Sequence, residues 1–102
     1  MRVPEDPYVR ELLPEFVDSW IEDLKNQLPE LLNTKNDTDL YRLAHTLKGS
    51  CLQFGLDEIA QTGIELMGHA KDQNWEEAAL YESKLTDAFA EVRKMLDNGE
   101  LI

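Results

Sequence analysis

Residues 40–55 read Leu-Tyr-Arg-Leu-Ala-His-Thr-Leu-Lys-Gly-Ser-Cys-Leu-Gln-Phe-Gly, and this stretch decides the fold. At about 100° per residue, its apolar side chains fall on one arc roughly 100° wide, the buried stripe of an amphipathic helix. That stripe holds Leu40, Leu43, Ala44, Leu47, Cys51 and Phe54. A second arc, turned well away from it, holds Tyr41, His45, Lys48, Gly49 and Leu52. The pattern predicts a helix from about Thr38 to Phe54, ended by Gly55, with His45 facing outward.

Three other segments repeat apolar residues every three or four positions, over residues 16–32, 59–70 and 78–96. No segment shows the alternation that is typical of a strand. Pro14 suits the first turn of a helix, so we expect a short helix through Leu13 and a new helix from Pro14, with a kink or restart at Pro29. We therefore predict an all-α fold, an antiparallel four-helix bundle with a short extra N-terminal helix, in one domain over residues 1–102.

The helix starts are marked by capping residues. Asn36 followed by Asp39, or Asp37 alone, can cap the central helix. Asn74 with Glu77 forms a capping-box-like pair for the last helix.

Other residues predict packing rather than chemistry. Gly63 lies on the inner face of its helix, together with Ile64, and should let two helices approach closely. Trp20 and Trp75 are expected to pack in the core and at a helix start. His69 should form a solvated salt bridge with an acidic neighbour.

The chain has 10 Lys and Arg against 21 Asp and Glu, a formal net charge of −11. We expect no nucleic-acid partner, because phosphates require a basic surface. No apolar run approaches the roughly 20 residues of a bilayer span, and no signal peptide opens the chain, so neither membrane insertion nor export is expected. The single cysteine, Cys51, lies on the buried stripe, which favours an inert thiol and a cytoplasmic location.

Acidic residues are unevenly spread along the chain. From Leu40 through Leu56 there is no Asp or Glu, whereas Arg42 and Lys48 lie inside this window. A random window of that length in so acidic a chain would hold about three or four acids. Either this helix is more buried than the others, or an anionic group approaches it.

Gly49 departs from what a helix favours. A glycine inside a helix costs about 1 kcal/mol relative to alanine, and Gly49 faces away from the buried stripe, so packing explains it poorly. It follows His45 by four residues, and its missing side chain leaves space beside the imidazole. With Lys48 nearby, this cluster suits a nucleophile that accepts a phosphoryl group. The alternative is a surface histidine beside an incidental lysine and glycine.

The stretch His45-Thr46-Leu47-Lys48-Gly49-Ser50, ending in Gly55 and followed by an apolar helix, resembles the motif of histidine-containing phosphotransfer (HPt) domains. The resemblance extends from the helix that begins Pro14-Glu15-Phe16 through both later helices. It implies a carrier in multistep two-component signalling, without ATP-dependent kinase activity of its own. Such a carrier takes a phosphoryl group from the aspartate of one receiver domain and passes it to another.

The resemblance also implies roles for single residues. His45 is the phosphoacceptor, Lys48 stabilises the phosphoryl group, and Gly49 gives the receiver's active site room. Family members often place a polar residue such as glutamine on the next helix, facing the histidine, but here Met67 takes that position, and Lys71 one turn on could substitute. The implied partners are response-regulator receiver domains and a hybrid histidine kinase, with Mg²⁺ supplied by the receiver and none bound by this chain.

Tyr41 and Leu52 flank His45, and exposed apolar residues around a reactive group suggest a docking patch rather than incidental exposure. Two other functions remain open. The chain could be a helical adaptor that binds a receiver or kinase domain without carrying phosphate, or a fragment of a chemotaxis-type kinase. The residues present do not predict a zinc site, because His45 and His69 lack further ligands at suitable spacing.

Overall fold

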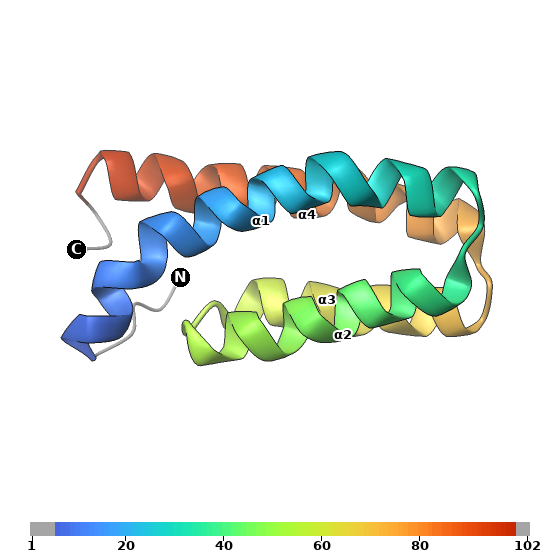
Figure 1. Ribbon diagram of the computed structural model, residues 1–102, viewed down its shortest axis with the longest axis horizontal. Coiled ribbons are helices and arrows are strands. Elements are labelled where there is room, and N and C mark those ends of the chain that lie inside the picture. The colour runs from blue at the N-terminus through green and yellow to red at the C-terminus, as the bar shows by residue number, and fades with distance from the viewer. Residues whose placement is uncertain (1–5, 100–102) are drawn as a thin grey trace.

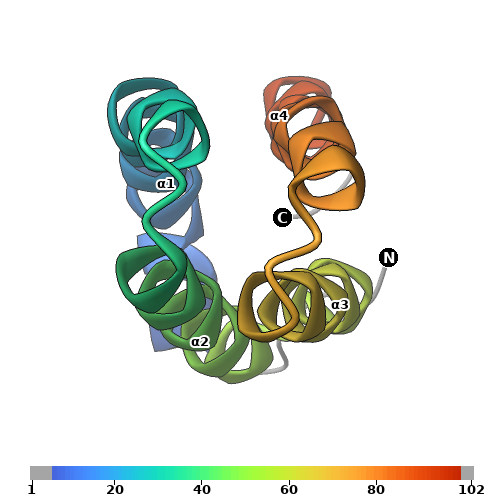
Figure 2. The same cartoon turned by 90° about the vertical axis from the view of Figure 1, so that its right-hand side faces the viewer.

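The computed structural model describes residues 6–99, and these form four helices without any strand. The helices are α1 (Pro7–Asn33), α2 (Asp37–Gln53), α3 (Asp57–Lys71) and α4 (Trp75–Asp97). Each runs antiparallel to the one before it (Figure 1), and seen along the bundle they occupy four corners, with α1 and α4 on one side and α2 and α3 on the other (Figure 2). The all-α, four-helix prediction is therefore confirmed, whereas the expectation about a signal peptide concerns residues that lie largely outside the described range.

One apolar core fills the space between the helices. Every helix contributes a stripe of buried side chains, and no polar or charged side chain within residues 6–99 is buried. From α2 the buried residues are those that the sequence stripe predicted, Leu40, Ala44, Leu47 and Cys51, with Leu43 and Phe54 partly buried against them. The helix with His45 is thus held along one side and open along the other.

The prediction of a separate N-terminal helix is wrong. A single helix, α1, runs through both Pro14 and Pro29. Leu13 and Val17, four residues apart across Pro14, are both buried in the core, and only a continuous helix keeps them on one stripe. This burial offsets the backbone hydrogen bond that a proline cannot make. The first turns of α1 slope toward the end of α2 (Figure 1), where the ring of Phe16 stacks on that of Phe54 at 3.9 Å between centroids.

Both ends of α2 lie where the sequence predicted them. Asn36 is the N-cap, and its side-chain oxygen accepts a hydrogen bond from the backbone N–H of Asp39 at 3.2 Å. At the other end Gly55 has φ +75°, a left-handed conformation that glycine adopts without strain. The prediction for Asn74 is wrong, because this exposed residue precedes α4 but its side chain caps no backbone N–H. Solvent reaches the first turn of α4 and can satisfy those donors instead.

Gly63 brings α2 and α3 together, as predicted. A Cβ atom added there would lie 3.3 Å from the backbone oxygen of Ala44 and 3.3 Å from Leu47 Cδ2. The placement of Ile64 on the inner face is wrong: this side chain is 43% exposed, because it lies about 100° around α3 from Gly63. None of the helices formed by residues 6–99 has the length and apolarity needed to cross a bilayer.

Candidate functional site

The outward face of α2 carries the predicted cluster. His45 and Gly49 are exposed, and Lys48 is half-buried. Tyr41 is 39% exposed and Leu52 is 52% exposed, so both flank His45 on the surface. The outward orientation of His45, on which the phosphoacceptor hypothesis depends, is confirmed as a matter of geometry.

The imidazole lies in a shallow hollow on this face. Its walls are Thr38, Tyr41, Arg42 and His45 itself, and its volume is about 320 Å³. The Tyr41 ring lies nearly parallel to the imidazole, with 6.4 Å between centroids and 22° between planes. His45 has no hydrogen-bond or ion-pair partner among the described side chains. Both ring nitrogens therefore stay available for chemistry with an incoming group.

Gly49 keeps the approach to His45 open. A Cβ atom built on it would meet no atom within 4 Å. Packing against another helix therefore gives no reason for glycine here, in contrast to Gly63. Lys48 forms no ion pair with any side chain in the described part of the chain, so its ammonium is available to a ligand.

Lys71 and Met67, the two residues considered as a second support, do not join the hollow that holds His45. Lys71 lines a neighbouring hollow of about 410 Å³, together with Asp37, Thr38, Tyr41 and Ala70. Tyr41 and Thr38 line both hollows and lie between Lys71 and His45. Met67 is partly buried and packs against the core. Lys71 thus lines a hollow that shares the walls Thr38 and Tyr41 with the hollow of His45, but it does not line the hollow of His45 itself.

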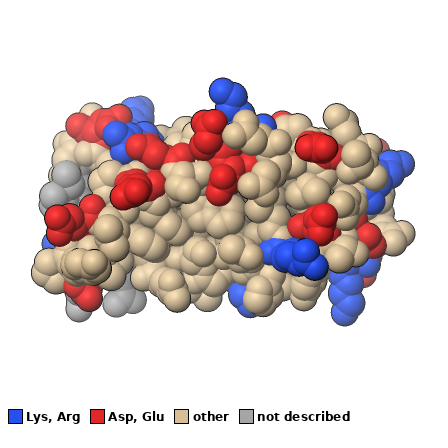
Figure 3. Space-filling model, viewed as in Figure 1, with Lys and Arg blue, Asp and Glu red and all other residues tan. Residues whose placement is uncertain are grey.

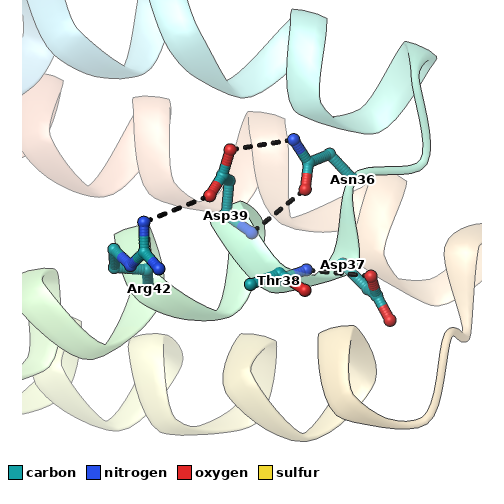
Figure 4. Close-up of polar contacts among 5 residues, drawn as sticks. All are labelled: Asn36, Asp37, Thr38, Asp39 and Arg42. Carbon is teal, nitrogen blue, oxygen red and sulfur yellow. Dashed lines mark hydrogen bonds and ion pairs between the residues drawn. The ribbon is translucent and has the colours of Figure 1, made fainter.

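Sequence reasoning missed Arg42 as a site residue. Its side chain shares the hollow with His45 and pairs with Asp39, with 3.3 Å between Arg42 Nη1 and Asp39 Oδ1 (Figure 4). Arg42 and Asp39 also line a groove of about 480 Å³ between α1 and α2. The available signal was the spacing of three residues between Arg42 and His45, which places neighbours on one helical face.

The charge distribution sets this face apart from its surroundings. Acidic side chains gather over α1 in the upper part of Figure 3, whereas the surface over the middle of α2 carries few of them. Burial alone does not explain the absence of acids from residues 40–56, because Tyr41, His45, Gly49 and Leu52 in that window are exposed. The structure thus favours the second interpretation of the window, a surface that tolerates an anionic group.

The remaining titratable residues near the core serve packing. Cys51 is fully buried, and desolvation raises the pKa of its thiol to about 12, so the thiol is unreactive at neutral pH. The salt bridge expected for His69 is absent from the described residues. Its ring instead lies 5.3 Å from that of Tyr81, while the Tyr81 hydroxyl donates to Glu65 Oε1 at 3.0 Å.

The two tryptophans pack as predicted, Trp20 within the core and Trp75 partly buried at the start of α4. Within residues 6–99, no three His, Cys, Asp or Glu side chains come together as metal ligands would.

Comparisons with known proteins agree with this geometry. The family model described as "Hpt domain" matches residues 11–98, so the chain belongs to the Hpt domain family. The chain is also 28% identical over 92 residues to the "Phosphorelay intermediate protein rdeA" of Dictyostelium discoideum. That alignment covers 87% of this chain and 36% of the relative, so the chain spans little more than a third of the relative's length. No solved structure matches the chain significantly.

Proposed function

We propose that this domain carries a phosphoryl group on His45 between receiver domains of a multistep two-component phosphorelay. The observation that carries the proposal is an exposed imidazole in the middle of α2, without a hydrogen-bond or ion-pair partner among the described residues, with open space at Gly49 beside it. A phosphorylated receiver aspartate is the donor, and a second receiver is the acceptor. A hybrid histidine kinase supplies the first receiver.

The transfer step depends mainly on how the imidazole of His45 is positioned toward the phosphorus atom. The unprotonated ring nitrogen of His45 uses its lone pair to form an N–P bond while the P–O bond to the receiver aspartate breaks. The carboxylate leaves with that bond's electron pair, and the other ring nitrogen retains its proton. The return step reverses these bond changes toward the second receiver. The domain thus contributes an oriented nucleophile and room for the receiver's active site.

Charge neutralisation completes the proposed mechanism. Mg²⁺ comes with the receiver domain, where it would neutralise the moving phosphoryl group. On this chain, Lys48 supplies a cation one turn from His45, and Lys71 supplies a second cation farther from it. A chelator should stop transfer between the partners.

The test is phosphotransfer from a radiolabelled receiver of the source organism. The wild-type chain should acquire an acid-labile, alkali-stable label, and His45→Gln should not. His69→Gln is the matched control, because His69 is the only other histidine and should label normally. A label that persists in His45→Gln would refute the proposal.

A second candidate is an adaptor that binds a receiver without carrying phosphate, and the exposed apolar pair of Tyr41 and Leu52 favours it. Leu52→Arg should weaken receiver binding under either function. Leu80→Arg is its matched control, since Leu80 is 53% exposed but lies on α4. If His45→Gln keeps binding and the wild-type chain never acquires a label from any receiver, the adaptor function replaces the relay.

A further inference from the structure

Arg42 pairs with Asp39 and also lines the hollow that holds His45, so it can exchange Asp39 for a group bound in that hollow. Its guanidinium pairs with Asp39 Oδ1 at 3.3 Å, and the two side chains are 74% and 49% exposed. The other carboxylate oxygen, Oδ2, accepts a hydrogen bond from Asn36 Nδ2 at 2.9 Å (Figure 4). Asp39 therefore stays anchored to the helix cap if Arg42 leaves. Because exposed ion pairs are weak, little holds Arg42 to Asp39.

The imidazole lies over the turn that contains Arg42. Helical side chains point toward the N-terminus, so His45 covers the turn that precedes its own Cα. The residues lining the hollow agree, because Thr38, Tyr41 and Arg42 all precede His45 in α2. A group attached to the outer ring nitrogen would thus be within reach of Arg42 on one side, with Lys48 reaching back from the next turn.

We propose that Arg42 is a second cation of the phosphoryl site, and that it exchanges Asp39 for the phosphoryl group when His45 is modified. This inference rests on the proposed function. The phosphoryl group carries up to about two negative charges and three acceptor oxygens, so it competes for a guanidinium better than a carboxylate that Asn36 already holds. The planar fork of arginine can bind two of those oxygens at once, which a lysine ammonium cannot do.

Asp39 competes with the phosphoryl group for the guanidinium of Arg42. It is the acid nearest to His45 on the N-terminal side, just before the acid-free window begins at Leu40. While His45 is unmodified, the guanidinium of Arg42 pairs with Asp39 at the wall of the hollow. Once the phosphoryl group is present, Arg42 neutralises it and slows its loss to water, in which a water oxygen attacks phosphorus while the N–P bond breaks.

The experiment is a double-mutant cycle on the lifetime of the phosphorylated chain after removal of the receiver. Arg42→Ala should be labelled on His45 but should lose the label about two- to fivefold faster, the change that an exposed ion pair is worth. Asp39→Asn should lengthen the lifetime up to about twofold, because it frees Arg42. In the Arg42→Ala background, Asp39→Asn should have little further effect, since its influence passes through Arg42.

A merely structural role for this pair would look different. If Arg42 and Asp39 only stabilised the start of α2, both single variants would change the lifetime in the same direction, and circular dichroism would report lost helix. Arg42→Lys keeps the charge without the fork and should give an intermediate lifetime.

The possible failures are distinguishable. An unchanged lifetime in Arg42→Ala, or an equal effect of Asp39→Asn with and without Arg42, overturns the assignment of Arg42 alone. Failure of the wild-type chain to acquire any label overturns the proposed function itself.

Discussion

Substitution of Gly49 separates stability from function most clearly, because the structure predicts that a side chain there raises the stability of the helix but lowers the rate of phosphotransfer. A Cβ atom at this position meets nothing within 4 Å, so Gly49→Ala should fit without any adjustment of its neighbours. Alanine in a helix interior is favoured over glycine by about 1 kcal/mol. In a domain of about 100 residues this gain corresponds to a rise in melting temperature of about 4–8 °C.

The same open space is what the proposed transfer requires. Gly49→Gln places a long side chain beside the imidazole, where the receiver's active site must enter. A displacement of reacting groups by about 1 Å can cost on the order of a hundredfold in rate, so transfer to this variant should fall about ten- to a hundredfold. Gly49→Ala should show a smaller loss in the same direction, together with the full gain in stability.

Gly68→Ala is the matched control. Gly68 also lies inside a helix, α3, and a Cβ atom there also meets nothing within 4 Å. The Gly68→Ala variant should gain about the same stability as Gly49→Ala and keep the wild-type transfer rate, which would show that added stability alone does not slow transfer. Thermal unfolding followed by circular dichroism measures the first quantity, and rapid-quench transfer from a labelled receiver measures the second. A wild-type transfer rate in Gly49→Gln would refute the reasoning about access.

Further predictions concern other parts of the bundle. Gly63→Ala should fall short of the stability gain of about 1 kcal/mol expected for Gly68→Ala in urea unfolding, because its Cβ would lie 3.3 Å from the backbone oxygen of Ala44; an equal gain in the two variants would contradict that packing. Cys51 should react with a thiol reagent only as fast as the chain unfolds, and its pKa of about 12 means that stability falls as pH rises from about 9 toward 12. Burial likewise raises the pKa of Tyr81, so Tyr81→Phe should reduce the loss of stability at high pH. The same dependence of stability on pH in this variant and in the wild type would contradict a role for the Tyr81 hydroxyl in that loss. Lys48→Ala should keep receiver binding but shorten the phosphohistidine lifetime, and an equal lifetime would contradict its role.

The sequence predicted most of the fold because each helix carries a strong apolar period and clear end signals. The predicted boundaries of α2 agree with the structure within one residue, with Asn36 as the N-cap and Gly55 directly after the C-cap Phe54. The predicted break at Pro14 is wrong, because burial of core residues on both sides of it outweighs the local effect of a proline on the helix backbone. Only the structure shows that Leu13 and Val17 must share one buried stripe across it.

The candidate site was predictable wherever one helix contains it. Helical spacing alone placed His45, Lys48 and Gly49 on one open face. Contacts between helices were harder to foresee, because they depend on how α3 is rotated about its own axis. Ile64 therefore came out exposed, and Lys71 came out beside Tyr41 rather than His45. The sequence shows Arg42 inside the acid-free window, but only the structure shows that it lines the same hollow as His45.

One measurement tests the central claim most directly. After incubation with a phosphorylated receiver, the modified residue can be mapped by tandem mass spectrometry under alkaline conditions, which preserve phosphohistidine. The phosphoryl group should be found on His45 and on no other residue. A phosphoryl group on His69, or an unmodified chain after incubation with every receiver of the source organism, would contradict the account.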